Sequence, residues 1–179
     1  MHSDVERILI DEEEISSIVS NMAKKINNDL NGDPLLVVII LKGSTPFAMD
    51  LIRKLDMPVE IDFMQVSSYG KSTESNGFIN MKRDLEQDVT GKNLLIVEDI
   101  IDSGNTLYKV KALFEHRKAK SVRICTLLDK PSRRVVDVDV NYVGKEIPDE
   151  FVVGYGLDFS EKYRNLPYVG ILKRSVYEW

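Results

Sequence analysis

The chain has 179 residues, 43% of them hydrophobic, with a formal net charge of −5 and a pI of about 5.2. This predicts one globular domain and argues against nucleic-acid binding as the main function. The longest apolar run, 35–41, is too short to span a bilayer, and the N-terminus lacks the pattern of a secretory signal. The single cysteine, Cys125, lies in an apolar run and is expected to be a buried, inert thiol. We therefore expect a soluble cytoplasmic protein.

The first two thirds of the chain alternate between helix-like and strand-like segments. Residues 11–32 begin with four acids, which suit the positive end of a helix dipole, then place apolar side chains at helical spacing up to Gly32. Residues 35–41 are apolar on both faces, as in a central strand of a parallel sheet. Further strands are expected at 59–69, 94–100 and 121–129, and further helices at 44–55 and 104–117. This order predicts an α/β fold with a doubly wound, mainly parallel sheet.

Beyond residue 130 the pattern changes to short strand-like pieces broken by Gly and Pro, which predicts a small β-rich lobe. We therefore expect a single domain over 1–179, with a core at about 5–128 and the lobe mainly at 129–179. Residues 69–80 are rich in Gly, Ser, Thr and Asn. A hairpin turn and a mobile lid are equally compatible with that composition.

Three polar segments fall at the expected carboxyl ends of strands. They are Leu41-Lys42-Gly43-Ser44, the stretch from Glu98 to Thr106, and Asp129-Lys130. In an open parallel sheet, ligands bind beyond these ends of the strands. Their convergence therefore favours a ligand site at this edge of the sheet.

The tetrapeptide Ser103-Gly104-Asn105-Thr106 opens the expected helix and suits a terminal phosphate. Gly104 lets backbone N–H groups turn towards a ligand, and the start of a helix carries a partial positive charge. The hydroxyls of Ser103 and Thr106 add hydrogen-bond donors. An ordinary helix capped by Ser or Thr is the commoner use of such a sequence and stays open as an alternative.

Three acids, Glu98, Asp99 and Asp102, stand directly before this loop. Consecutive carboxylates at the end of a buried strand destabilise the fold unless something offsets their charge. Glu98 and Asp99 point to opposite faces of a strand, so one can reach a sugar diol and the other a hydrated magnesium ion. Asp102 lies on the turn and can face a reacting centre. Surface acids or salt bridges are the alternative, which the position at a strand end disfavours.

The segment VEDIIDSGNTL resembles the 5-phosphoribosyl-1-pyrophosphate (PRPP) signature of the type I phosphoribosyltransferases. LKGS resembles the pyrophosphate loop of the bacterial hypoxanthine/guanine branch of that family, and VSSYG the start of its lid. LLDKP and KEIPDEFVVGYGLDFSEKYRNLPYVGIL resemble its base-binding lobe. The resemblance runs from about residue 5 to the C-terminus. It implies purine salvage, in which the phosphoribosyl group of PRPP passes to hypoxanthine or guanine to give IMP or GMP and pyrophosphate.

The resemblance also implies how PRPP and magnesium are bound. Glu98 and Asp99 hold the ribose hydroxyls, directly or through Mg²⁺, and Asp102 lies near N7 of the purine as a proton acceptor. The 5-phosphate is cradled by Ser103, Gly104, Asn105 and Thr106. Pyrophosphate is bound by Leu41, Lys42, Gly43 and Arg164, in a loop that carries an unusual cis peptide in this family.

For the purine, the resemblance implies that Lys130 donates to the 6-oxo oxygen, that Phe151 stacks on the ring and that the Val152 backbone meets its edge. Asp158 approaches a second Mg²⁺ or its waters beside the base, and Ser68 and Tyr69 close over the site. A Lys ammonium only donates, so it suits hypoxanthine or guanine and not a 6-amino purine. Without the family, Lys130 fits a surface lysine, Phe151 a core residue and Arg164 a surface ion pair.

Three rival functions remain at this stage. A xanthine or uracil phosphoribosyltransferase shares residues 98–106, and a PRPP-sensing regulator without activity shares the phosphate site. A dinucleotide-binding protein is disfavoured, since no G-x-G-x-x-G follows the first buried strand. The resemblance suggests a homo-dimer or homo-tetramer that binds small molecules, with no nucleic-acid or membrane partner. The preference between hypoxanthine and guanine stays open.

Overall fold

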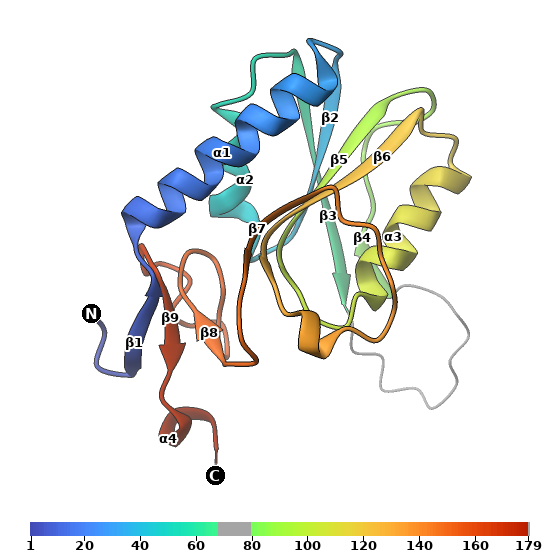
Figure 1. Ribbon diagram of the computed structural model, residues 1–179. Coiled ribbons are helices and arrows are strands. Elements are labelled where there is room, and N and C mark those ends of the chain that lie inside the picture. Colours follow the sequence, from blue (N-terminus) through green and yellow to red (C-terminus); the bar gives the residue numbers. More distant parts are fainter. Residues whose placement is uncertain (68–79, 179) are drawn as a thin grey trace.

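The computed structural model describes residues 1–67 and 80–178, and its central feature is a six-stranded sheet in the order β4-β3-β2-β5-β6-β7 (Figure 1). Its strands are β2 (Leu35–Ile40), β3 (Val59–Ser67), β4 (Asn80–Arg83), β5 (Asn93–Ile101), β6 (Ser121–Asp129) and β7 (Tyr142–Glu146). All neighbouring strands pair in parallel, except β4, which runs antiparallel to β3 at one edge. The predicted mainly parallel sheet is confirmed.

The three long helices, α1 (Glu12–Leu30), α2 (Thr45–Ile52) and α3 (Asn105–His116), follow the predicted order. At the start of α1, the carboxylate of Asp11 accepts a hydrogen bond of 2.8 Å from the backbone N–H of Glu14. The last residue of this helix is Leu30, two positions before the predicted stop at Gly32. The cap is Asn31, which adopts the left-handed conformation with φ 46°. Asn tolerates that conformation better than most residues, which explains the difference.

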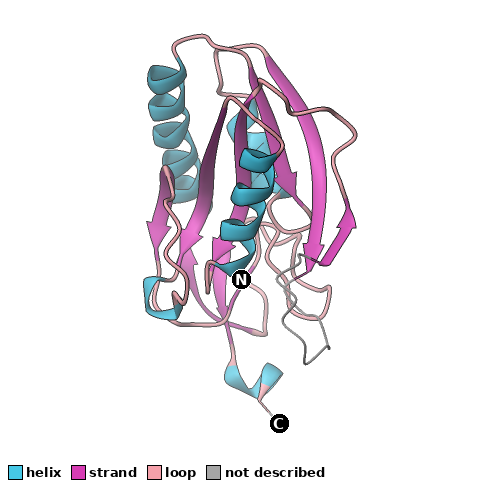
Figure 2. Cartoon of the chain, turned by 90° about the vertical axis from the view of Figure 1, so that its right-hand side faces the viewer, coloured by secondary structure: helices cyan, strands magenta, loops and turns pink. Residues whose placement is uncertain are grey.

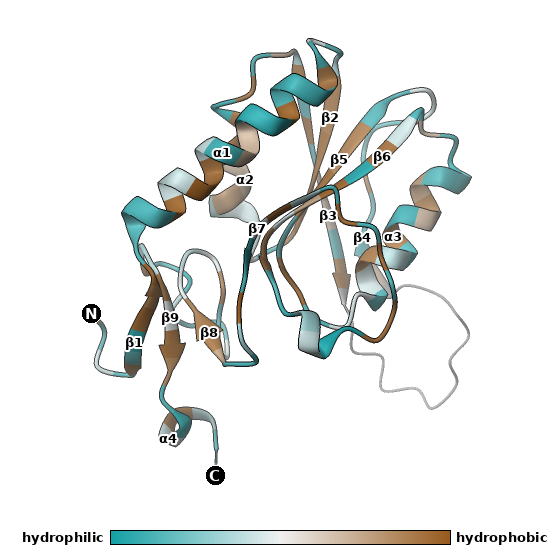
Figure 3. Cartoon of the chain, viewed as in Figure 1, coloured by the Kyte–Doolittle hydropathy of each residue, from teal (hydrophilic) through white to brown (hydrophobic). Residues whose placement is uncertain are grey.

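The helices cover both faces of the sheet (Figures 1 and 2). Val37 and Ile39 of β2 pack in the cluster that contains α1 and α2, whereas Leu36 and Val38 pack in the cluster that contains α3. Because successive strand residues face opposite sides, this run must be apolar throughout. Figure 3 accordingly shows the central strands as hydrophobic and the outer faces of α1 and α3 as largely hydrophilic.

A second, three-stranded antiparallel sheet in the order β1-β9-β8 lies beside the start of α1 (Figure 1). Its strands are β1 (Val5–Ile10), β8 (Val152–Val153) and β9 (Val169–Leu172). Two short helices, η1 (Pro131–Arg133) and α4 (Arg174–Tyr177), follow β6 and β9 respectively. The N-terminal strand was not predicted. The small sheet thus combines strands from both ends of the chain. Strand β7 lies in the segment predicted to form the small lobe, but it pairs in the main sheet. Among the described residues, no helix is long and apolar enough to cross a membrane.

The arrangement of β2 and β5 positions the candidate site. These strands are direct neighbours, but α2 leaves β2 towards one face and α3 leaves β5 towards the other. The loops at their carboxyl ends therefore diverge and leave a crevice between them, as at the switch point of other doubly wound sheets.

Candidate active site

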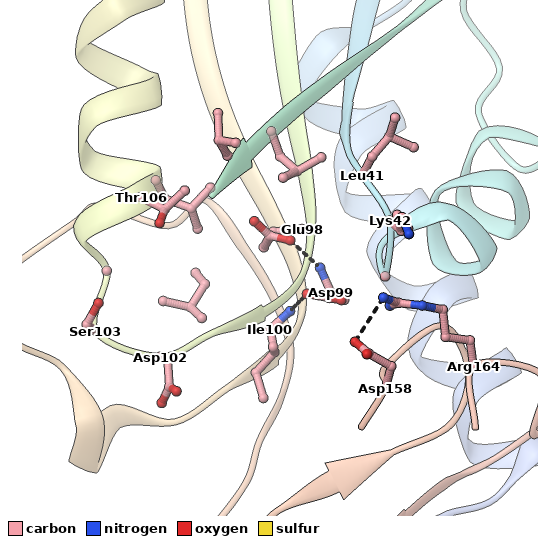
Figure 4. Close-up of a pocket in the computed structure, with 16 residues that line it drawn as sticks. Leu41, Lys42, Glu98, Asp99, Ile100, Asp102, Ser103, Thr106, Asp158 and Arg164 are labelled. Carbon is pink, nitrogen blue, oxygen red and sulfur yellow. Dashed lines mark hydrogen bonds and ion pairs between the residues drawn. The ribbon is translucent and has the colours of Figure 1, made fainter. Parts of the chain in front are cut away.

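A cavity of about 390 Å³ lies at the carboxyl ends of β2 and β5 (Figure 4). Among its lining residues are many of those that the sequence singled out: Leu41, Lys42, Gly43, Glu98, Asp99, Asp102, Ser103, Gly104, Thr106, Asp158 and Arg164. Four other candidates, Asn105, Lys130, Phe151 and Val152, lie outside this lining. Ser68 and Tyr69, the candidate lid residues, lie outside the described part of the chain.

Glu98 and Asp99 lie where β5 changes from fully buried to partly buried residues. Asp99 Oδ1 accepts a hydrogen bond of 2.7 Å from the Ile100 backbone, and Glu98 Oε1 accepts one of 3.2 Å from the Asp99 backbone (Figure 4). Burial raises the pKa of Glu98 well above its ordinary value, and the neighbouring Asp99 raises it further. Burial also raises the pKa of Asp99. The negative charge of these two acids is therefore incompletely offset, so the pair suits a bound cation or a sugar diol.

The N-cap of α3 has no side chain to cap the helix, but Ser103 Oγ accepts a hydrogen bond of 3.4 Å from the Asn105 backbone N–H and one of 3.2 Å from Asn105 Nδ2. Gly104 is the N-cap and adopts φ 83°. A Cβ at this position would come within 2.6 Å of the Val136 carbonyl oxygen, which explains why glycine is needed. The backbone N–H groups of the first turn that follow Asn105, with the hydroxyl groups of Ser103 and Thr106, can serve as donors to an anion at this helix start.

The loop after β2 contains a cis peptide bond between Leu41 and Lys42. The next residue, Gly43, lies tightly between two neighbours. A Cβ on Gly43 would come within 1.7 Å of Asp99 Oδ2, and a Cβ on Gly156 would come within 1.9 Å of the Gly43 carbonyl oxygen. Only residues without side chains allow the loop to lie this close to the acid and to the small lobe.

Arg164 reaches the cavity from the small lobe and is held by several partners. Its Nη1 donates to the Gly156 carbonyl at 2.8 Å, and its Nη2 lies 3.0 Å from Asp158 Oδ1 (Figure 4) and 3.3 Å from Glu161 Oε2. The same Glu161 oxygen lies 2.9 Å from Lys42 Nζ. The buried Nε of Arg164 has no hydrogen-bond partner among the described residues. Lys42 and Arg164 together give the cavity two cationic groups at one end.

Asp102 and Lys130 are connected by ion pairs that the sequence did not reveal. Arg133 Nε lies 3.4 Å from Asp102 Oδ1, and its Nη1 lies 3.6 Å from Asp149 Oδ2. Asp149 Oδ1 in turn lies 3.9 Å from Lys130 Nζ. Lys130 is only 9% exposed, so it is not the solvated surface lysine that its sequence context allowed. Asp102 therefore lies in the cavity wall and is linked to Lys130 through three successive ion pairs.

Phe151 is not a core residue, since it is 37% exposed. One face of its ring stacks on Tyr177 with centroids 5.0 Å apart, and the edge of Phe159 lies at 5.5 Å. The next residue, Val152, is buried in β8. The exposed part of the Phe151 ring is thus available to a planar ligand.

Sequence reasoning missed four charged residues that contact the site: Arg133, Arg134, Asp149 and Glu161. Arg134 Nε donates to the Asp102 carbonyl at 3.3 Å and pairs with Asp129, which holds the turn before the Ser103–Thr106 loop. The only signal for these residues was their closeness in sequence to Lys130, Phe151 and Asp158. Cys125 is buried, as predicted, and burial raises the pKa of its thiol.

Comparison with known proteins identifies the class. A family model described as a phosphoribosyl transferase domain matches residues 7–160. A crystal structure of a hypoxanthine phosphoribosyltransferase from Staphylococcus aureus superposes with a TM-score of 0.94 at 49% identity and covers 100% of this chain and 97% of that one. The fold is that of a phosphoribosyltransferase.

Relatives of known sequence narrow the family further. The hypoxanthine-guanine phosphoribosyltransferase of Bacillus subtilis (strain 168) is 51% identical over 178 residues, covering 99% of both chains. The bifunctional protein TilS/HprT of Listeria monocytogenes is 49% identical over 177 residues. The present chain spans only 27% of the length of that protein. The chain belongs to the hypoxanthine-guanine phosphoribosyltransferase family.

Proposed function

We propose that this protein transfers the 5-phosphoribosyl group of PRPP to hypoxanthine or guanine, giving IMP or GMP and pyrophosphate in purine salvage. One observation carries the proposal. One cavity is lined by Ser103, Gly104 and Thr106 of the loop before α3, by the acids Glu98 and Asp99, and by the loop at Leu41–Gly43. These are an anion site, a diol or cation site and a second anion site, which are the parts that PRPP requires.

The 5-phosphate is proposed to bind at the start of α3. Its proposed donors are the backbone N–H groups of the first turn after Asn105 and the hydroxyls of Ser103 and Thr106, with Gly104 and Asn105 shaping the turn. The pyrophosphate is proposed to bind at the opposite loop, where Leu41, Lys42 and Gly43 meet Arg164. The ribose then lies between the two, beside Glu98 and Asp99.

Magnesium is the proposed cofactor. The acid pair Glu98 and Asp99 fits a divalent cation, because burial raises the pKa of both carboxyls and a nearby cation offsets that cost. Among the described residues no cluster of three or more His, Cys, Asp or Glu side chains is present. Mg²⁺ usually takes one or two carboxylates and completes its coordination with substrate oxygens and water. When bound, Mg²⁺ neutralises charge on the departing pyrophosphate. Asp158 is proposed as a second contact.

The displacement at the anomeric carbon is expected to place positive charge on the ribose, as in glycoside chemistry. A carboxylate about 4 Å away stabilises such a charge by roughly 4 kcal/mol at an effective dielectric constant near 20, before desolvation is counted. The acids beside the ribose therefore act on the transition state, and Lys42 stabilises the leaving group. Asp102 is proposed to accept a proton from the purine as its nitrogen attacks.

Base selection is assigned to Lys130, Phe151 and Val152. The low exposure of Lys130 and its distance of 3.9 Å to Asp149 Oδ1 support a held, charged donor for a 6-oxo group. The open part of the Phe151 ring supports stacking on the purine. Asp158, Ser68 and Tyr69 keep the roles that the family implies. A homo-dimer or homo-tetramer, the division into core and lobe, and a cytoplasmic location stay predictions.

The test is pyrophosphate release from PRPP and Mg²⁺ with hypoxanthine, guanine, xanthine, adenine or uracil as the single added base. We expect release with hypoxanthine or guanine and loss of release when a chelator removes the metal. Release with xanthine or uracil alone would move the protein to a different base specificity. Silence with all five bases, in protein that still binds PRPP, would favour the rival PRPP-sensing regulator.

A further inference from the structure

Glu161 is an acid that the proposed reaction does not use, although it touches the proposed pyrophosphate site. Its Oε2 atom lies 2.9 Å from Lys42 Nζ and 3.3 Å from Arg164 Nη2. A single carboxylate oxygen thus joins a cation from the β2 loop to a cation from the small lobe, across 119 positions of sequence. Both contacts hold the pKa of Glu161 below its usual value, and the hydrogen bond from Lys42 is the larger cause.

The backbone around Glu161 aims it at these cations. Ser160 and Glu161 adopt left-handed conformations with φ 51° and 64°, and the Glu161 N–H donates to Asp158 Oδ2 at 2.8 Å. Residues Phe159 and Lys162 close the turn with two backbone hydrogen bonds of 3.0 and 3.2 Å. The backbone of Glu161 is therefore fixed.

The side chain of Glu161, in contrast, is free to leave. It is 65% exposed, whereas the neighbouring Asp158 is 29% exposed. Arg164 remains anchored without Glu161, since it also bonds to the Gly156 carbonyl and Asp158. For Lys42, Glu161 is the one charged partner among the described residues. The counterion of the two cations, Glu161, can therefore move into solvent with little loss of free energy.

We propose that Glu161 is a displaceable counterion of the pyrophosphate site: its carboxylate occupies the donors of Lys42 and Arg164 when the site is empty and competes with the pyrophosphate group of PRPP. This rests on the proposed function of the cavity. Binding of the pyrophosphate group releases Glu161 to solvent. Its return neutralises both cations and favours release of the product. Glu161 therefore weakens the binding of PRPP and of pyrophosphate equally and does not affect the binding of the purine.

The test is Glu161→Gln, which keeps the shape of the side chain and removes its charge. An exposed ion pair changes an equilibrium by a factor of about 1.4 to 5. Loss of both pairs should therefore tighten binding of magnesium pyrophosphate and of PRPP by roughly twofold to 25-fold in titration calorimetry. The KM for hypoxanthine should not change. Glu161→Asp, which keeps the charge, should lie closer to the unmodified protein.

Glu115→Gln is the matched control, because it removes the same charge from the exposed far end of α3. It should leave pyrophosphate binding unchanged and so exclude an effect of net charge. Weaker or equal binding by Glu161→Gln, in protein with an unchanged melting temperature, would overturn the proposal and make Glu161 a residue that positions the cations. If the unmodified protein binds neither PRPP nor pyrophosphate, it is the proposed function of the cavity that fails.

Discussion

Replacing Gly43 by alanine places a methyl group where Asp99 already has its carboxylate. The new Cβ would lie 1.7 Å from Asp99 Oδ2 and 2.9 Å from its Cγ. The Gly156 carbonyl oxygen lies 3.4 Å from the same Cβ position, which leaves the loop little room to move. Asp99 must therefore turn away and give up its 2.7 Å hydrogen bond from the Ile100 backbone.

The size of the effect follows from that hydrogen bond. A hydrogen bond to a charged group contributes about 1.5–3 kcal/mol, which corresponds to roughly tenfold to 150-fold in an equilibrium constant. If substrate requires Asp99 in its present position, kcat/KM for PRPP should fall by about that factor in Gly43→Ala. The assay is pyrophosphate release at saturating hypoxanthine over a range of PRPP concentrations.

Gly32→Ala is the control for the backbone. Gly32 has φ 86° and no atom within 4 Å of an added Cβ, so the substitution strains the chain without touching the site. Left-handed backbone costs about 1–2 kcal/mol for other residues, which lowers Tm by roughly 2–8 °C in a chain of this size. Gly32→Ala should lose that stability and keep its activity. The reasoning is refuted if Gly43→Ala stays within twofold of the unmodified kcat/KM, or if Gly32→Ala loses as much activity.

Three further substitutions test single residues. Asp102→Asn should lower kcat by about 100-fold to 10,000-fold and leave PRPP binding nearly intact; equal losses in both would contradict a general base. Lys130→Ala should reduce the preference for 6-oxopurines over adenine in the same assay, and unchanged activity with hypoxanthine would contradict its role. Tyr155→Phe removes the 2.6 Å hydrogen bond to Asp50 and should lower Tm by about 2–4 °C while raising the KM for PRPP; an unchanged Tm would show that this bond contributes nothing.

The sequence was sufficient where local pattern determines structure. The runs that became β2, β5 and β6 are long and apolar, and the helices that became α1 and α3 show clear spacing, so both the order and the sheet type were predictable. The site loops were predictable for the same reason, since they stand at the ends of those strands. Each of these predictions depended on residues close together in the chain.

Features that depend on distant partners were not predictable. β1 alternates poorly and becomes a strand because it pairs with β9, more than 150 residues away. Glu161 looks like any exposed acid until the fold brings Lys42 to it. Arg133 and Asp149 likewise gain meaning only when η1 and the segment before β8 bring them together. In each case the missing information was a long-range contact and not a local preference.

The loop Leu41–Gly43 lies between the acid Asp99 of β5 and the small lobe, and it contacts both. Asp99, Gly43 and Gly156 lie in contact one behind the other, with no side chain from either glycine between them. Arg164 binds the outer end of this row through the Gly156 carbonyl at 2.8 Å. A shift of the loop must therefore move the β5 acid and the lobe arginine with it. The proposed ribose, metal and pyrophosphate contacts therefore all depend on this one row, which explains why glycine occupies two positions where any side chain would separate the lobe from the main sheet.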